Sequence, residues 1–208
     1  MQKLNLPELL VITGQSGAGK GTVTKILSRL CLERDIPIVK MGTGDAIRIA
    51  CEKDTYLFNK MRKLHNTGEK QPGFFALGLW FIAIGNIMRE GNLNILEGAP
   101  RSERQVEDLV ELIECGYFSS LKIVEVIAPN RICKKRLIAR TKKDKRSDLS
   151  IDEKPGIPDV RKIRRKMAWW NERRARIVRT AKKAGIYLQI DNSGKKQNTE
   201  RGLIKLFA

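Results

Sequence analysis

A short apolar run followed by a glycine-rich turn and an amphipathic segment constrains this chain more than any other feature. Residues 9–30 read LLVITGQSGAGKGTVTKILSRL. From Gly14 the turn follows the pattern G-x-x-x-x-G-K-[ST], except that Gly21 replaces the hydroxyl residue and Thr22 comes next. Glycines let backbone N–H groups surround phosphate oxygens, and the helix N-terminus adds a favourable dipole. Strand, glycine turn and helix in this order are the context that such a loop requires. The sequence therefore predicts a nucleotide phosphate site at Gly17, Ala18, Gly19, Lys20, Gly21 and Thr22.

Lys20 and Thr22 have separate predicted roles in this loop. The Lys20 ammonium would lie near the β- and γ-phosphates as a point charge. The Thr22 hydroxyl would hold Mg²⁺, directly or through water. No spacing typical of a protein-only metal site surrounds the single histidine, His65, or the four cysteines. We therefore expect Mg²⁺ to arrive with the nucleotide, and a surface or packing role for His65.

Short Val/Ile-rich runs alternate with longer periodic segments along the rest of the chain. Such runs suit buried parallel strands, and their alternation with helices predicts an α/β protein with a five-stranded parallel sheet covered on both faces. The length of 208 residues allows one sizeable core, so we predict a single domain, residues 1–208. The expected strands are 9–13, 37–40, 93–97, 121–128 and 186–191. The expected helical segments are 19–34, 44–65, 73–90, 102–115, 129–140, 158–184 and 198–207.

Two excursions interrupt the alternation of strands and helices. Residues 42–72 hold helical segments without a strand, and residues 141–160 are charged, contain Pro and Gly, and are poor in apolar residues. Mobile loops over a site are drawn from such segments. We therefore predict two mobile lobes, at about 42–72 and 141–164.

The chain is strongly basic, with a net charge of +18 and a pI of about 10. The excess is localised, because residues 131–183 contain 21 Lys and Arg but only six Asp and Glu. This balance indicates anionic partners such as nucleotides, nucleic acid or anionic lipid, although a solvated helix face is an equally ordinary explanation. Trp169 and Trp170 could stack on bases, but core-facing aromatics on a long helix are commoner.

The cysteines and the longest apolar run help to predict the cellular compartment of the protein. Cys31, Cys115 and Cys133 lie in apolar-periodic segments, where buried free thiols are expected. The run at 74–88 is shorter than the roughly 20 residues that span a bilayer, so we expect a buried helix there. No signal peptide is evident in MQKLNLPE, and a reducing cytoplasm is the expected location.

The Gly-Lys-Gly-Thr ending of the phosphate loop resembles that of the adenylate kinase-like nucleoside monophosphate kinases, with Ser16 in place of their proline. The segment MGTGDAIR, 41–48, is similar to their S-T-G-D-x-x-R. By that resemblance Thr43 lies beside the acceptor base and Arg48 holds the acceptor phosphate. Thr43 or Asp45 is also a plausible helix N-cap.

The segment ILEGAPRSERQ, 95–105, resembles the family's L-D-G-F-P-R-T-x-x-Q. The resemblance places Gly98 against the acceptor, Arg101 on its phosphate and Gln105 on the adenine edge. Glu97 replaces the family's Asp near the magnesium, and Ala99 replaces its Phe. Thr43 and Gln105 together favour AMP as the acceptor.

The run RICKKRLIART, 131–141, resembles the segment that leads into the family's lid. The resemblance places Arg136 on the donor adenine and Arg140 on the donor phosphates, and the short-lid spacing adds Arg146 and Asp148. A later family arginine aligns with Lys166, which is flanked by Arg164 and Arg165. The turn near Gly194 would reach the donor purine.

The resemblance implies a three-layer α/β/α P-loop NTPase fold and a monomeric adenylate kinase, which transfers a phosphoryl group from MgATP to AMP. Phosphoryl transfer needs positioning and charge neutralisation more than covalent chemistry. The implied catalytic residues are therefore the cations Lys20, Arg101, Arg140 and Arg146. A UMP or CMP kinase is the alternative within this chemistry. A nucleotide-dependent RNA- or ribosome-binding protein, with the basic region 131–183 on nucleic acid, is the less favoured alternative of another class.

Overall fold

A parallel five-stranded sheet forms the centre of the computed structural model, which describes residues 3–67, 78–79, 81–82, 85, 88–144, 149–151 and 154–208. The strand order is β2-β3-β1-β4-β7, and every neighbouring pair is parallel. This confirms the predicted α/β fold and each predicted strand. The strands are β1 (Leu9–Thr13), β2 (Ile38–Gly42), β3 (Leu93–Glu97), β4 (Leu121–Ile127) and β7 (Tyr187–Asp191).

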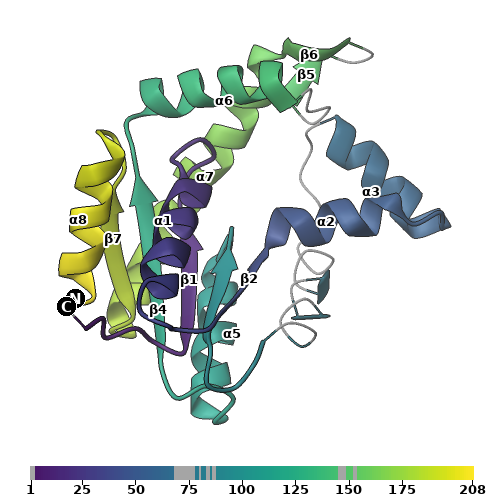
Figure 1. Cartoon of the computed structure of the whole chain (residues 1–208). Helices are drawn as coiled ribbons and strands as arrows, with labels where there is room; N and C mark the ends of the chain where they lie inside the picture. The colour runs from purple at the N-terminus through teal and green to yellow at the C-terminus, as the bar shows by residue number, and fades with distance from the viewer. Residues whose placement is uncertain are drawn as a thin grey trace.

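Helices cover both faces of the sheet (Figure 1). On one face, α1 (Lys20–Leu32) and α8 (Lys196–Leu206) pack against a core that includes Leu27 and Leu203. On the other, α5 (Glu103–Glu114) and α7 (Val160–Lys183) contribute Leu109 and Ile177 to a second core. Every residue of β1 is buried, because this central strand lies between the two cores. Its continuous apolar sequence is therefore what a strand covered on both faces requires.

The functional loops gather where the parallel strands end. The turn after β1 leads into α1, and the turn after β4 leads into α6 (Asn130–Asp144), which lies beyond that edge of the sheet (Figure 1). Ligands of open α/β sheets bind at the carboxyl ends of the strands. The fold thus places the predicted phosphate loop at the edge where a nucleotide site is expected.

The first excursion contains two helices instead of one continuous segment. The predicted helix 44–65 is divided into α2 (Thr43–Glu52) and α3 (Tyr56–Asn66). The division occurs because the Thr55 side chain caps α3 by accepting a hydrogen bond from the backbone N–H of Phe58 at 3.4 Å. A Ser or Thr hydroxyl at an N-cap commonly starts a helix in this way.

The second excursion contains a small hairpin that the sequence did not predict. Strands β5 (Ser150–Ile151) and β6 (Lys154–Pro158) pair antiparallel next to α6. Their short length and two prolines hide the alternation of apolar and polar residues by which a strand is normally recognised. Residues 145–148, which include Arg146 and Asp148, lie outside the described residues.

One burial prediction is wrong. Cys115 is exposed because it caps the C-terminal end of α5, whereas Cys31 and Cys133 are buried free thiols as expected. Most of the run 74–88, for which a buried helix was predicted, lies outside the described residues. Among its described residues, Phe81 and Ile82 are exposed, whereas Leu79 and Met88 are partly buried against hydrophobic clusters. Across the described residues, no helix has both the length and the apolar character needed to cross a membrane.

Candidate active site

The turn between β1 and α1 forms an open loop whose glycines are required by its surroundings. Gly17 has a φ of 85°, and a Cβ atom there would collide with the carbonyl oxygen of Cys133 on α6. Gly14 has a φ of 134°, and a Cβ atom would collide with the carbonyl of Val126 on β4. Residues with a Cβ atom are strained at such φ values, whereas glycine is not. The loop is therefore pressed against β4 and α6, and its glycines serve this close approach as well as phosphate binding.

Lys20 begins α1 and folds back over the loop. Its Nζ donates hydrogen bonds to the carbonyl oxygens of Gly14 at 2.9 Å and Gln15 at 3.1 Å. Burial lowers the pKa of Lys20 to about 8; the charges of Arg101 and Arg140 act in the same direction, and Glu97 opposes them. Three cations and one carboxylate thus converge on the loop, an arrangement suited to a polyanion.

Glu97 ends β3 beside the first turn of α1. Its Oε2 accepts a hydrogen bond from the Thr24 hydroxyl at 2.9 Å, and its backbone carbonyl accepts one from the Thr43 hydroxyl at 3.0 Å. Both carboxylate oxygens lie 3.8 Å from the point where a Cβ of Gly21 would be. Within the described part of the chain, Oε1 accepts no hydrogen bond. A carboxylate oxygen beside Gly21, at the first turn of α1, is therefore available for a metal ion or its water.

Arg101 follows the strand end in the loop between β3 and α5. Its Nε donates to the Gly98 carbonyl at 2.8 Å, and its backbone N–H donates to Oε1 of Gln105 at 2.5 Å. Surrounding protein atoms lower the pKa of the guanidinium, although the residue keeps part of its surface exposed. Gly98, with a φ of 92°, lies between Thr43 and Arg101. The predicted acceptor residues Thr43, Gly98, Arg101 and Gln105 are therefore neighbours.

The phosphate loop is also held by Asn192, which directly follows β7 and which the sequence analysis missed. Asn192 is 2% exposed, and its Nδ2 donates to the Ala18 carbonyl at 2.8 Å. Arg136 donates to that same carbonyl at 3.0 Å and to the Asn192 carbonyl at 2.8 Å. Thr199 of α8 donates to Oδ1 of Asn192 at 3.0 Å. Arg136, predicted to lie on the donor adenine, thus contacts the loop, and the only sequence signal for Asn192 was its place directly after a strand.

The remaining predicted residues are more dispersed. Arg48 pairs with Asp45 on α2, and Arg140 is exposed on α6. Lys166 is half-buried on α7, and Gly194 is exposed in the turn after β7. Arg48 lies on the helix that follows β2, and Gly194 follows β7, both at the carboxyl edge of the sheet; Arg146 is not among the described residues.

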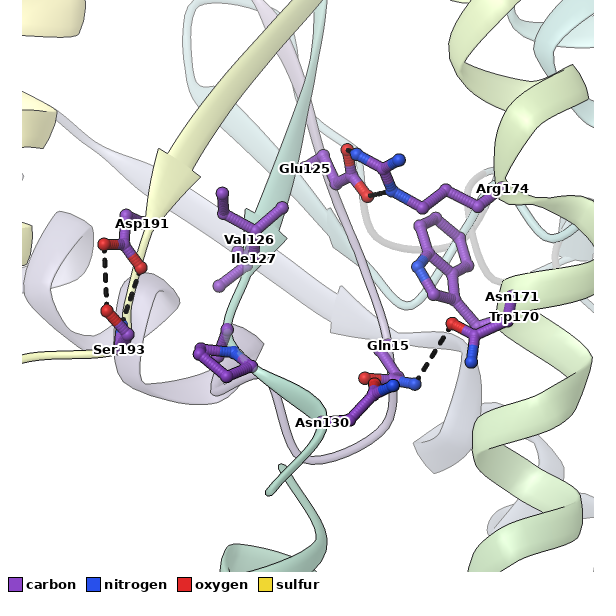
Figure 2. A pocket seen from close by; sticks show the side chains of 12 residues that line it. Gln15, Glu125, Val126, Ile127, Asn130, Trp170, Asn171, Arg174, Asp191 and Ser193 are labelled. Atoms are coloured by element: carbon purple, nitrogen blue, oxygen red, sulfur yellow. Dashed lines mark hydrogen bonds and ion pairs between the residues drawn. The ribbon is translucent and has the colours of Figure 1, made fainter. Parts of the chain in front are cut away.

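A pocket of about 450 Å³ lies behind the phosphate loop, between α7 and the ends of β4 and β7 (Figure 2). Gln15 of the loop donates to Oδ1 of Asn171 on α7 at 3.2 Å. Deeper in, Glu125 is 1% exposed and forms a two-pronged ion pair with Arg174, at 2.6 and 2.9 Å. The hydroxyl of Tyr187 donates to Glu125 at 2.6 Å, and burial together with this carboxylate raises the Tyr187 pKa. These contacts fix α7 against the loop.

Comparison with known proteins gives the family. A family model described as an AAA domain matches residues 13–154. The adenylate kinase of Prochlorococcus marinus is 31% identical over 136 residues, which cover 65% of this chain and 70% of the relative. The chain belongs to the AAA domain family of that model and to the adenylate kinases. The adenylate kinase of Leptospira biflexa is 26% identical over 94% of this chain and 97% of its own length. The adenylate kinase of Borrelia duttonii is 30% identical, and the match spans 56% of that enzyme's length.

Family membership agrees with the architecture. The matched region of the AAA domain model begins at Thr13, the last residue of β1, and includes the phosphate loop, Glu97 and Arg101. The Leptospira relative extends the likeness over almost the whole chain. Adenylate kinases are nucleoside monophosphate kinases with a P-loop NTPase fold, so the fold and class of enzyme expected from the sequence are confirmed.

Proposed function

We propose that this adenylate kinase family member transfers the terminal phosphoryl group of MgATP to AMP, reversibly, giving two ADP. The observation that carries the proposal is the convergence of Lys20, Arg101 and Arg140 on one edge of the sheet, close enough for their charges to lower the pKa of Lys20. Cations placed in advance around transferring phosphates supply most of the catalysis in this chemistry. No general acid or base is required.

The donor site is assigned to the loop and the residues around it. Backbone N–H groups of Gly17 to Thr22 would bind the ATP phosphates, with Lys20 at the β- and γ-phosphates. Arg140 would approach these phosphates from α6. Arg136 and Gly194 lie on the side proposed for the adenine, where Arg136 and Asn192 already hold the Ala18 carbonyl.

The residues near Glu97 suit the magnesium ion that accompanies ATP. Mg²⁺ prefers hard oxygen ligands and keeps several waters. The Glu97 carboxylate, which lies beside Gly21, and the hydroxyl of the next residue, Thr22, are ligands of this kind. These two residues would hold the ion, which neutralises phosphate charge when bound. The longer Glu in place of Asp suits contact through water.

The acceptor site is assigned to Thr43, Arg48, Gly98, Arg101 and Gln105, with Arg146 by family resemblance and Lys166 or a neighbouring arginine at the acceptor phosphate. Gln105 uses its Oε1 for the backbone of Arg101, which leaves its amide nitrogen as a donor. The ring nitrogens of adenine accept from such a donor, but the other bases offer acceptors too. The proposal of AMP therefore rests on the family resemblance, which has Thr and Gln at the positions of Thr43 and Gln105. We also propose that the enzyme acts as a monomer in the cytoplasm.

We expect ADP formation from MgATP to be fastest with AMP when AMP, UMP, CMP and GMP are compared in a coupled assay. A site that hydrogen-bonds one base discriminates against others by about 10²-fold or more in kcat/KM. A reaction without acceptor controls for ATP hydrolysis. A preference for UMP or CMP would overturn the assignments of Thr43 and Gln105, and inactivity with all four would overturn the proposed reaction.

The lowered pKa of Lys20 predicts a pH dependence. In the free enzyme the Lys20 ammonium loses its proton as the pH rises through about 8, and its attraction for phosphate is lost with it. Because kcat/KM reports the free enzyme, its value for MgATP should fall about tenfold per pH unit above this point. Lys20→Arg should abolish this alkaline decrease in kcat/KM, because arginine stays charged. If the decrease persisted in Lys20→Arg, it would arise from the titration of another group.

The lowered pKa of Lys20 also makes the free energy of unfolding depend on pH. Between about 8 and 10.5 the unfolded chain keeps the Lys20 proton and the folded chain has lost it. The unfolded state then binds more protons, so the free energy of unfolding contributed by Lys20 increases with pH across this window. Stability and ATP affinity should therefore respond to alkaline pH in opposite directions.

A further inference from the structure

The outward face of α7 carries positive charge that the nucleotide site does not use. This helix contains eleven Lys and Arg and one Glu. Arg176, Arg179 and Lys183 are all exposed and follow the i, i+3, i+7 spacing of a single helix face. We call these three residues the outer basic row.

The outer basic row points away from the sheet. Ile177 and Ala181, on the opposite side of the same turns, are buried in the core beneath α7. Asn171 is where α7 touches the phosphate loop, and Lys183 lies about 18 Å beyond it along the helix axis. Arg176 is nearer, at about 8 Å along the axis, but it shares the face that lies opposite the buried residues, so the row as a whole faces away from the loop.

The charges of the row are not neutralised within the described part of the chain. None of its three side chains forms an ion pair or hydrogen bond there. Two carboxylates lie nearby: Glu172 is four residues before Arg176, and Glu103 of α5 accepts a hydrogen bond from Thr180. Lys182, stacked over the Tyr187 ring, adds a further cation beside the row. The local balance remains positive.

We propose that the outer basic row is a docking surface for the phosphate backbone of a double-stranded nucleic acid. The row extends for about 10 Å along the helix, which corresponds to about three phosphates of one strand. Two of its members are arginines, whose planar guanidinium can bind phosphate through two parallel hydrogen bonds. Binding of this kind is independent of base sequence.

The side chains around the row favour a duplex over the other polyanions. Single strands are commonly bound by stacking of bases on exposed aromatic rings, but Trp169 and Trp170 are half-buried, and Trp170 packs against the core. Helices that lie in a membrane surface insert apolar side chains beside their cations. The one large apolar residue exposed on α7 is Val160, sixteen positions before Arg176. The row thus offers charge and hydrogen bonds alone.

The test is fluorescence anisotropy with labelled 20-base-pair RNA and DNA duplexes between 50 and 200 mM salt. The variant is Arg176→Gln/Arg179→Gln/Lys183→Gln. The matched control, Lys25→Gln/Arg201→Gln/Lys205→Gln, removes the same charge from exposed positions on α1 and α8, on the other face of the sheet. All three proteins should retain their helical circular dichroism and their turnover of ATP.

We expect the wild type to bind a duplex with an affinity that falls steeply with salt. Removing three phosphate contacts should make the slope of log K against log salt shallower by about 2.7 and weaken binding more than tenfold at low salt. The control should stay within threefold of the wild type. Comparing the affinities for the RNA duplex and the DNA duplex shows which of the two the row binds more tightly. Equal losses in variant and control, no duplex binding at 50 mM salt, or tighter binding to vesicles containing phosphatidylserine than to either duplex would each overturn the proposal.

Discussion

Lys20→Ala is expected to lower kcat for ADP formation by about 10³-fold. Lys20 belongs to the loop, and its Nζ donates hydrogen bonds to the carbonyls of Gly14 and Gln15. Its ammonium would exchange these carbonyls for phosphate oxygens and oppose the charge that develops during transfer. Removing one donor of this kind from a preorganised site costs about 10²- to 10³-fold in rate, and a full charge belongs at the upper end. Initial rates with saturating MgATP and AMP measure the effect.

The control for Lys20→Ala is Lys25→Ala. Lys25 lies on the same helix, but it is exposed and contacts no residue of the loop. It should keep the wild-type rate and the wild-type free energy of unfolding. If Lys20→Ala retained more than about a tenth of the wild-type kcat, the assignment of Lys20 to the transferring phosphate would be wrong.

Arg101→Ala is expected to reduce kcat/KM for the acceptor by about 10³-fold or more. Positioned arginines contribute about 10³- to 10⁵-fold in phosphoryl transfer. The guanidinium of Arg101 is held by the Gly98 carbonyl, next to Thr43, and is therefore oriented before the acceptor binds. Its side chain makes no buried ion pair among the described residues, so the free energy of unfolding should change by less than about 1 kcal/mol. Steady-state kinetics with AMP as the varied substrate, and urea denaturation, measure the two quantities.

Arg101→Lys separates charge from geometry. Lysine keeps the positive charge but cannot form the two parallel hydrogen bonds of a guanidinium. We expect a rate between those of wild type and Arg101→Ala. Arg201→Ala, on the exposed face of α8, serves as the matched control and should behave as wild type. If lysine restored full activity, charge alone would explain the role of Arg101.

The sequence predicted those features that depend on neighbours along the chain. The five strands were recognised because each is a short, nearly continuous apolar run, as strands covered on both faces must be. The phosphate loop was recognised because its glycines, Lys20 and Thr22 are fixed by local spacing. Family motifs then predicted that Thr43, Gly98, Arg101 and Gln105 would lie together, as the fold places them.

The features that were missed depend on contacts between distant segments. Asn192 acts on the phosphate loop only because β7 brings it there, and no local pattern identifies such a residue. The hydrogen bond from Gln15 to Asn171 likewise joins segments that are 156 residues apart in the sequence, through the packing of α7. Cys115 was misjudged because apolar periodicity indicates which side of a helix is buried, but not that the helix ends there. The hairpin β5–β6 lacks the apolar content that marks a strand.

The two hydrogen bonds that hold the Ala18 carbonyl bear on when the phosphate loop acquires its shape during protein synthesis. The two groups that donate to this oxygen lie 118 and 174 residues further along the chain, in Arg136 and Asn192. A ribosome releases the glycine motif early, but the strand that carries Asn192 to the loop emerges near the end. A growing chain that has exposed the whole motif therefore still lacks the groups that fix its shape. We therefore expect a bound nucleotide to stabilise the protein fully only after β7 has joined the sheet and brought Asn192 to the loop.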